Sequence, residues 1–355
     1  MAENPYEFAV FGSTPLAAML AGLLAQEHHK RVCLVGERDT SFRLPRSIDL
    51  SVSTATRPES WALLRDGVPD IVRLIGKAHG RSALRKVDPI FVAETSESVE
   101  ALSYVRHVAL GMGQQVTEIA EVPGGGFGLQ LHEAVLVDRP ALAPALANWL
   151  TKLEVGQLRW GEVEAVIKRD GSARLHYAGA TFEASHAVLA DDAAILDLLD
   201  VDERDRTLQV KPVTAVTTEP AAALAAPVML YLDRGVTLVR GRGRGIAGLA
   251  VGKPETAIGR IGGCVAGDGV LRRTGQRLFR ALETVDGAPL VGAPRGAKAT
   301  VIAGLGQSGL FFAPALARLL AGRATELEGS YFAAREAGRG NARALVAEFS
   351  PRVEA

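Results

Sequence analysis

Residues 8–35 read FAVFGSTPLAAMLAGLLAQEHHKRVCLV, and this stretch carries the clearest structural signal in the chain. It predicts a buried strand over Phe8–Phe11, a helix over Leu16–Gln26 and a second buried strand over Arg31–Val35. Between the first strand and the helix lies a turn at Gly12–Pro15, and Pro15 suits the first helical turn, where a missing N–H breaks no hydrogen bond. Because a helical crossover joins the strands, we expect them to pair in parallel, as in βαβ units that bind dinucleotides.

The glycine turn is the first candidate binding site. In the dinucleotide pattern Gly-x-Gly-x-x-Gly, the three glycine positions correspond here to Gly12, Thr14 and Ala17, so only the first glycine is kept. The helix start still offers free N–H groups and the positive end of a dipole, and the Thr14 hydroxyl can donate to a phosphate. Gly12, Ser13, Thr14 and Leu16 are therefore the predicted contacts. The alternative is a βαβ unit that binds no nucleotide.

Glu37 follows the second predicted strand, with Arg38 beside it. A carboxylate in this position accepts hydrogen bonds from the ribose hydroxyls of an adenosine. It also repels a 2′-phosphate, which disfavours NADP and leaves NAD and FAD. Glu37 and Arg38 are accordingly predicted to contact the cofactor.

The rest of the chain is expected to alternate between nucleotide-fold segments and antiparallel strands. Two helices are predicted at 59–66 and 70–77, with Gly67 as a stop between them, and a third at 96–110. Asp138 is expected to cap a helix over 140–153. Strands are predicted at 88–93, 135–137, 162–167, 173–177, 181–183, 187–190, 213–217, 228–232, 236–239, 246–251 and 300–303, and a last helix at 311–320.

The amino-acid composition argues against several classes of protein. Lys plus Arg and Asp plus Glu number 40 each, so the formal net charge is zero, which argues against a dedicated nucleic-acid binder. The two cysteines, Cys33 and Cys264, are too few for a disulfide scaffold and lack metal-ligand spacing. The apolar stretch 16–24 is too short to span a bilayer, and the residues before it do not read as a signal peptide. We expect a cytoplasmic protein with no membrane span; a protein partner or a homo-oligomer stays open.

The C-terminal part carries two further motifs. Residues 284–292 read TVDGAPLVG, and residues 304–315 read GLGQSGLFFAPA. Together with the Gly12 turn, Asp138 and the predicted strand at 187–190, their order resembles the FAD-dependent amino-acid oxidase and dehydrogenase family, which includes glycine oxidase and D-amino-acid dehydrogenase. The resemblance spans nearly the whole chain.

That resemblance implies a fold, a cofactor and a reaction. It implies an α/β fold, with a Rossmann-like FAD-binding domain of discontinuous segments (1–60, 131–205 and 276–355) and an antiparallel-sheet substrate domain (61–130 and 206–275). The implied activity is an FAD-dependent oxidoreductase that oxidises the C–N bond of an amino acid or related amine.

The resemblance also implies site residues. Backbone at Val163 and Ala190 would flank the cofactor. Gly304, Gly306, Gln307, Ser308 and Gly309 would present N–H groups to the flavin ring, where negative charge develops on reduction. Arg280 would bind the substrate carboxylate and Tyr231 would cap the pocket.

Three departures from the family pattern keep other functions open. Asp191-Asp192 replaces a glycine, Leu305 stands where relatives carry histidine, and Arg280 lies one residue upstream of the family's arginine. Acids at 191 and 192 would repel a flavin phosphate unless they face solvent. An accessory or maturation flavoprotein with little amine-oxidising activity is therefore the alternative, and a hydroxylating flavoprotein is a third reading.

Overall fold

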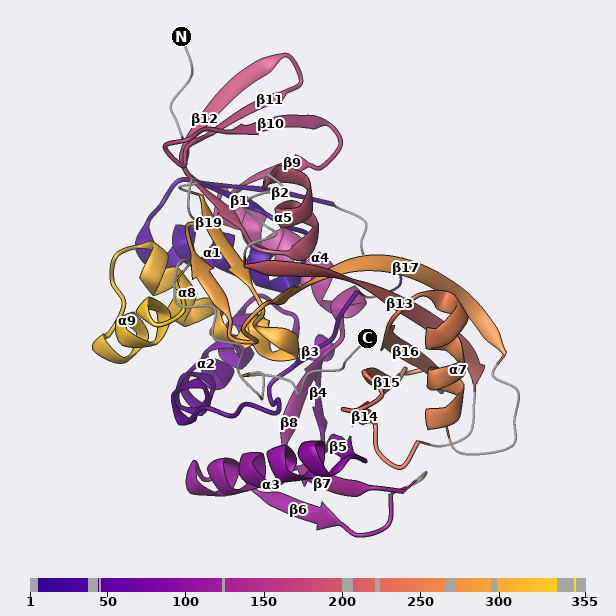
Figure 1. Cartoon of the computed structure of the whole chain (residues 1–355). Helices are drawn as coiled ribbons and strands as arrows, with labels where there is room; N and C mark the ends of the chain where they lie inside the picture. The colour runs from indigo at the N-terminus through magenta and orange to yellow at the C-terminus, as the bar shows by residue number, and fades with distance from the viewer. Residues whose placement is uncertain are drawn as a thin grey trace.

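The computed structural model describes residues 6–37, 44, 46–122, 125–199, 207–220, 224–265, 272–294, 299–336 and 348. Its secondary structure forms two large sheets with helices packed around them (Figure 1). Segments from the start, centre and end of the chain build one sheet, and intervening segments build the other. This is the α/β architecture that the sequence predicts.

The first sheet has the strand order β10-β11-β12-β1-β2-β9, with β19 beside β12 and β18 beside β19. The parallel pairs are β9–β2, β2–β1, β1–β12 and β12–β19. The strands are β1 (Tyr6–Phe11), β2 (Val32–Gly36), β9 (Gly156–Arg159), β10 (Val163–Ile167), β11 (Ala173–Tyr177), β12 (Ala180–Leu189), β18 (Leu290–Gly292) and β19 (Thr300–Ala303). The predicted parallel βαβ unit is confirmed.

Helix α1 (Pro15–His28) joins β1 to β2 and begins with Pro15 in its first turn. Thr14 is its N-cap: the Thr14 hydroxyl accepts from the Ala17 N–H at 3.4 Å. Helix α4 (Arg139–Lys152) packs on α1, and a Cβ at Gly22 would lie 2.1 Å from the Trp149 ring. The glycine therefore sets how closely the two helices approach, and Asp138 caps α4 as predicted.

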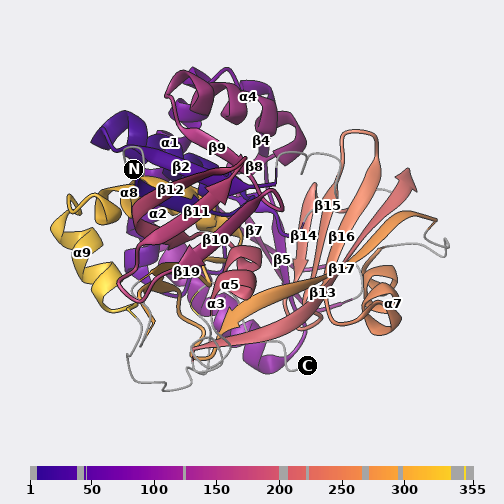
Figure 2. The same ribbon diagram turned by 90° about the horizontal axis from the view of Figure 1, so that it is seen from above.

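The second sheet has the order β17-β13-β16-β15-β14-β5-β7-β6 and is antiparallel except for the β14–β5 pair. Its strands are β5 (Ile90–Ala93), β6 (Val116–Ile119), β7 (Phe127–Leu131), β13 (Leu208–Pro220), β14 (Val228–Tyr231), β15 (Val236–Arg240), β16 (Gly245–Val251) and β17 (Arg273–Thr284). The long strands β13 and β17 run from the first sheet out to this one (Figure 2). A small third sheet joins β3 (Asp49–Leu50), β8 (Ala134–Val137) and β4 (Leu84–Val87).

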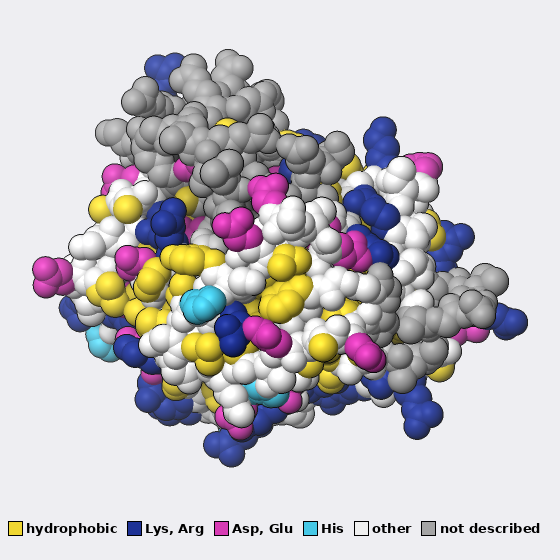
Figure 3. All heavy atoms as spheres, turned by 60° about the horizontal axis from the view of Figure 1, so that its bottom comes forward, with side chains coloured by type: hydrophobic (Ala, Val, Ile, Leu, Met, Phe, Trp, Pro, Cys, Tyr) yellow, Lys and Arg dark blue, Asp and Glu magenta, His cyan; other side chains and the backbone are white. Residues whose placement is uncertain are grey.

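The remaining helices cover these sheets. They are α2 (Pro58–Lys77), α3 (Ser96–Gly111), α5 (Asp192–Leu198), α7 (Pro254–Cys264), α8 (Ala313–Leu320) and α9 (Glu326–Ala333), with 3₁₀ turns at η2 (Arg81–Ala83) and η3 (Gly306–Phe312). No described helix combines the length and apolarity needed to cross a bilayer. On the face shown in Figure 3, acidic and basic side chains are interspersed among hydrophobic ones.

Three predictions about elements are wrong. The break expected at Gly67 is absent, since α2 runs through both Gly67 and Pro69. A Cβ at Gly67 would lie 2.1 Å from the Phe311 carbonyl oxygen, so this glycine serves close packing rather than helix termination. The separate strands expected at 181–183 and 187–190 are one strand, β12. The last helix starts as the 3₁₀ turn η3, which α8 continues.

Candidate functional site

A cavity of about 240 Å³ lies beside the Gly12 turn and is lined by residues of α4, of β2 and β9 in the first sheet, and of β17 in the second. Gly12, Ser13 and Thr14 line it from the turn, Glu37 from the end of β2, and Phe279 from β17. One wall is apolar and comes mainly from α4, through Leu142, Leu146 and Leu150. An apolar slot with a few polar groups at one end is the usual form of a small-molecule site.

The turn and the end of β2 are held together closely. The Gly12 N–H donates to the Val35 carbonyl at 2.9 Å, and the Glu37 N–H donates to the Ser13 hydroxyl at 2.9 Å. A Cβ at Gly36 would lie only 2.5 Å from the Gly12 carbonyl oxygen. Gly36 therefore permits the contact that brings Glu37 to the cavity; that Glu37 binds a cofactor stays a prediction. Arg38 lies outside the described residues.

The Asp191 side chain points to this turn, is partly buried and lines the cavity. Its Oδ2 accepts from the Ser13 N–H at 2.6 Å, and its Oδ1 accepts from the Ala194 N–H at 2.9 Å as the N-cap of α5. A Cβ at Gly12 would lie 3.2 Å from the Asp191 carboxylate. The carboxylate thus accepts a hydrogen bond from an N–H group at the start of α1, where free N–H groups would otherwise be available to an anion. Burial raises the pKa of Asp191, and its two backbone hydrogen bonds oppose that shift.

The neighbouring carboxylate, Asp192, points to β17, where its Oδ2 accepts from the Leu282 N–H at 3.1 Å. Burial raises the pKa of Asp192 to about 7, and the negative charge of Asp191 adds to the effect while the Leu282 hydrogen bond opposes it. The folded chain therefore holds a proton on Asp192 that the unfolded chain releases at lower pH.

As pH rises, the Asp192→Asn variant should consequently gain stability relative to the wild type. A raised carboxyl pKa contributes stability that is present at low pH and is lost as pH rises toward 7, so the wild type loses it and the amide variant does not. Urea unfolding at pH 5 and pH 8 should show the stability difference, variant minus wild type, growing by about 2 kcal/mol. A difference independent of pH would contradict this assignment.

Three arginines line the cavity: Arg46 and Arg277, which form a cationic end beside Phe279, and Arg139. The guanidinium carbons of Arg46 and Arg277 lie 5.4 Å and 5.1 Å from the centre of the Phe279 ring. Arg139 is paired with Asp49, with Nε 2.5 Å from Oδ2. None of these arginines is predicted as a site residue from the sequence, because their separation along the chain gives no motif.

The Gly12 turn and the glycine turn at 304–309, here called the closing turn, lie close together, as the family order implies. A Cβ at Gly309 would lie 3.7 Å from Leu16 Cδ2. The closing turn is bonded to the segment around β3, since Gln307 Nε2 donates to the Val52 carbonyl at 3.1 Å and Ser308 Oγ donates to the Leu50 carbonyl at 2.9 Å. No residue of 304–309 is among the described residues that line the cavity.

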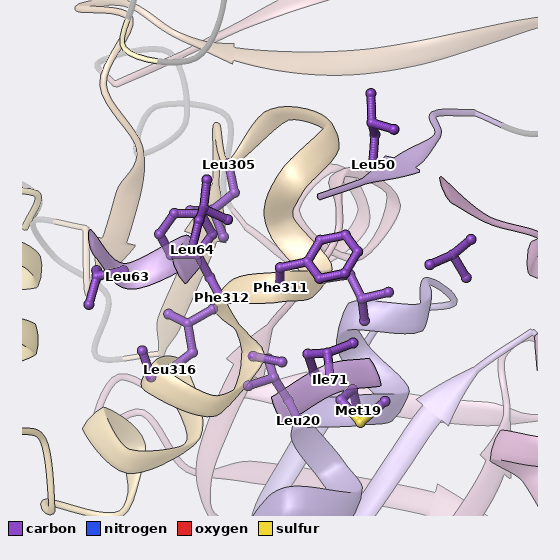
Figure 4. Packing of buried hydrophobic residues seen from close by; sticks show 14 of the residues in the cluster. Met19, Leu20, Leu50, Leu63, Leu64, Ile71, Leu305, Phe311, Phe312 and Leu316 are labelled. Atoms are coloured by element: carbon purple, nitrogen blue, oxygen red, sulfur yellow. The ribbon is translucent and has the colours of Figure 1, made fainter. Parts of the chain in front are cut away.

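Side chains of the closing turn fill the adjoining core. Leu305, Phe311 and Phe312 belong to one buried cluster with Leu64 and Ile71 (Figure 4). Leu305, in the position where relatives carry histidine, is thus a packing residue. Beside this contact, Ser53 is fully buried and its hydroxyl has no partner within the described part of the chain, so it requires a water or a ligand.

The other predicted site residues are not among those that line the cavity. The Ala190 N–H donates to the Phe11 carbonyl at 2.8 Å, and Val163 begins the β10–β11 hairpin. Tyr231 is buried in the second sheet, where its hydroxyl donates to the Cys264 carbonyl at 3.1 Å. Arg280 is exposed and, by strand alternation, lies on the face of β17 opposite Arg277 and Phe279. The roles assigned to these residues stay predictions.

Comparison with known proteins identifies the fold. No family model matches the chain, and no curated protein matches it by sequence. Solved structures match over almost the full length. Glycine oxidase from Geobacillus kaustophilus is 18% identical, covers 99% of each chain and has a TM-score of 0.67.

Two further matches have related activities in their names. Iminodiacetate oxidase from Chelativorans sp. BNC1 is 16% identical over 94% of this chain and 100% of that one, with a TM-score of 0.65. L-proline dehydrogenase from P. horikoshii is 14% identical over 94% and 97%, with a TM-score of 0.68. At these identities the likeness establishes the fold that the sequence resemblance implied.

Proposed function

We propose that this chain, which has the fold of the amino-acid oxidases and dehydrogenases, binds FAD and oxidises the C–N bond of an amine or amino acid. The observation that supports this most is the cavity that joins the Gly12 turn to Glu37 within that fold. A glycine turn, a helix N-terminus and an acid after the second strand are what an adenosine diphosphate group requires.

The residues fit the adenosine half of the cofactor. Glu37 would accept from the ribose hydroxyls, and the apolar face of α4 would cover the adenine. About 240 Å³ is below the roughly 300–1,000 Å³ of sites that enclose a drug-sized ligand, so the cavity suits the nucleoside part and not the whole dinucleotide. A diphosphate would need the Ser13 N–H, which here already donates to the Asp191 carboxylate.

When bound, the flavin supplies the hydride acceptor, so the chain itself has to bind and orient its ligands and exclude water. The cationic end formed by Arg46 and Arg277 would bind an anionic group, either a cofactor phosphate or a substrate carboxylate. The sequence assigns the carboxylate to Arg280, whereas Arg277 is the β17 arginine that reaches the cavity.

An anaerobic screen tests the reaction and the two arginines together. The FAD-loaded chain is mixed with amino acids and amines, and loss of the visible flavin band reports reduction. Arg277→Ala should slow reduction or weaken substrate binding by about 10–100-fold, the effect of losing a charged hydrogen bond. Arg273→Ala, at the far end of the same strand, is the control. If Arg280→Ala, and not Arg277→Ala, slows reduction or weakens substrate binding, the assignment of the substrate carboxylate to Arg280 is correct.

A second function, nucleotide binding without amine oxidation, is favoured by two observations. The Tyr231 hydroxyl is committed to the Cys264 carbonyl, and Arg280 is exposed. A chain that binds FAD but is bleached by no amine or amino acid would support this accessory role. Bleaching of the flavin by NADH or NADPH would instead support the interpretation as a hydroxylating flavoprotein.

A further inference from the structure

We propose that Asp191 is an internal competitor for the cofactor phosphate: its carboxylate occupies the phosphate-binding position at the Gly12 turn and must move before an adenosine diphosphate group can bind. This inference rests on the proposed function for the identity of the cofactor, but it concerns any nucleotide that carries a phosphate at this turn.

The contacts of Asp191 match those that a bound phosphate makes. A phosphate at a helix N-terminus accepts hydrogen bonds from the backbone N–H groups of the turn and the helix start. Asp191 Oδ2 accepts from the Ser13 N–H at 2.6 Å, and a Cβ at Gly12 would meet the Asp191 Cγ and Oδ2 at 3.2 Å. An N–H in the first turn of α1 is also satisfied internally, because the Ala17 N–H donates to Thr14 Oγ1.

A bound phosphate and the carboxylate cannot share this position. Both are acceptors for one N–H group, and two negative charges within about 4 Å of each other repel strongly in a partly buried site. The cationic end of the cavity favours the exchange: Arg46 already attracts the Asp191 charge and would equally attract a phosphate. The displaced carboxylate retains its second hydrogen bond, to the Ala194 N–H at 2.9 Å, so α5 can keep its cap.

Two substitutions at Asp191 separate its charge from its role as a helix cap. Asp191→Ser keeps an N-cap hydroxyl for α5 but is too short to reach the Ser13 N–H. Asp191→Asn keeps the size and removes the charge. Asp138→Ser is the matched control, since Asp138 also caps a helix beside the cavity, accepting from the Ala141 N–H at 3.4 Å, and does not contact the turn. Thermal unfolding of each variant checks that the chain is folded.

The measurement is the dissociation constant of FAD, and separately of ADP, by titration calorimetry. We expect Asp191→Ser to bind each ligand at least about tenfold more tightly than the wild type, with Asp191→Asn in between and Asp138→Ser unchanged. Equal FAD affinity in the wild type and Asp191→Ser would overturn the inference and leave the proposed function standing. Tighter ADP binding by Asp191→Ser without FAD binding in any variant would support the inference and overturn the proposed cofactor. If neither ligand binds any variant, both fail.

Discussion

Replacing Glu348 with alanine will destabilise the folded chain by about 3–5 kcal/mol, the cost of leaving a buried charge without its partner. The Glu348 carboxylate is 5% exposed and is bonded to Arg335, with Arg335 Nη2 2.7 Å from Oε1. It also accepts from the Ser60 hydroxyl and from the Tyr331 hydroxyl, the latter at 2.8 Å. Urea unfolding of the variant and the wild type measures the loss.

The surroundings of this carboxylate explain the size of the effect. Arg335 is 8% exposed and its guanidinium carbon lies 3.5 Å from the centre of the Tyr331 ring, so an unpaired guanidinium would stay buried. The Glu348 backbone also hydrogen-bonds to Thr56, just before α2, and to Gly287. Glu162→Ala is the control, because its pair with Arg159 is exposed and should cost under about 1 kcal/mol. Equal losses in the two variants would contradict the prediction.

Gly12→Val will abolish FAD binding. Gly12 has a φ of +155°, a conformation that side-chain-bearing residues rarely adopt, and a Cβ there would lie 2.9 Å from the Ala17 Cβ. The valine would push the turn away from α1 and occupy the space where a diphosphate must approach. We expect affinity to fall by more than about 100-fold, measured by quenching of flavin fluorescence.

Gly243→Val serves as the control for this substitution. A Cβ at Gly243 would meet no atom within 4 Å, and the residue lies between β15 and β16 away from the cavity. Its FAD affinity should match that of the wild type. If Gly12→Val retains wild-type affinity while staying folded, the cofactor does not bind at this turn.

The sequence predicts those parts of the fold and site that are encoded locally. β1, α1 and β2 follow from short apolar runs, one glycine and Pro15, and Glu37 follows from its place after β2. By contrast, Gly67 reads as a helix stop in the sequence, and only its packing against the Phe311 carbonyl shows why α2 continues. The strand β17, RTGQRLFRALET, is mostly exposed and polar, so no apolar alternation indicates it or its cavity-facing Arg277.

Asp191 shows a different limit. The sequence places two acids after β12 and predicts that they repel a phosphate unless they face solvent, but it does not determine which way they point. Asp191 points inward because one oxygen caps α5 and the other is then directed to the Ser13 N–H. Similarly, the order of motifs implies that the Gly12 turn and the closing turn meet. That Leu305 is a buried packing residue depends on its contacts in the hydrophobic cluster that includes residues of α2.

An equilibrium titration of FAD into the wild-type chain, repeated with ADP as competitor, tests the cofactor site most directly. We predict saturable binding of one FAD per chain, weakened by ADP because both ligands need the position beside Gly12 and Glu37. Absence of saturable FAD binding in the wild type and also in Asp191→Ser would contradict the assignment of this cavity to the adenosine half of FAD.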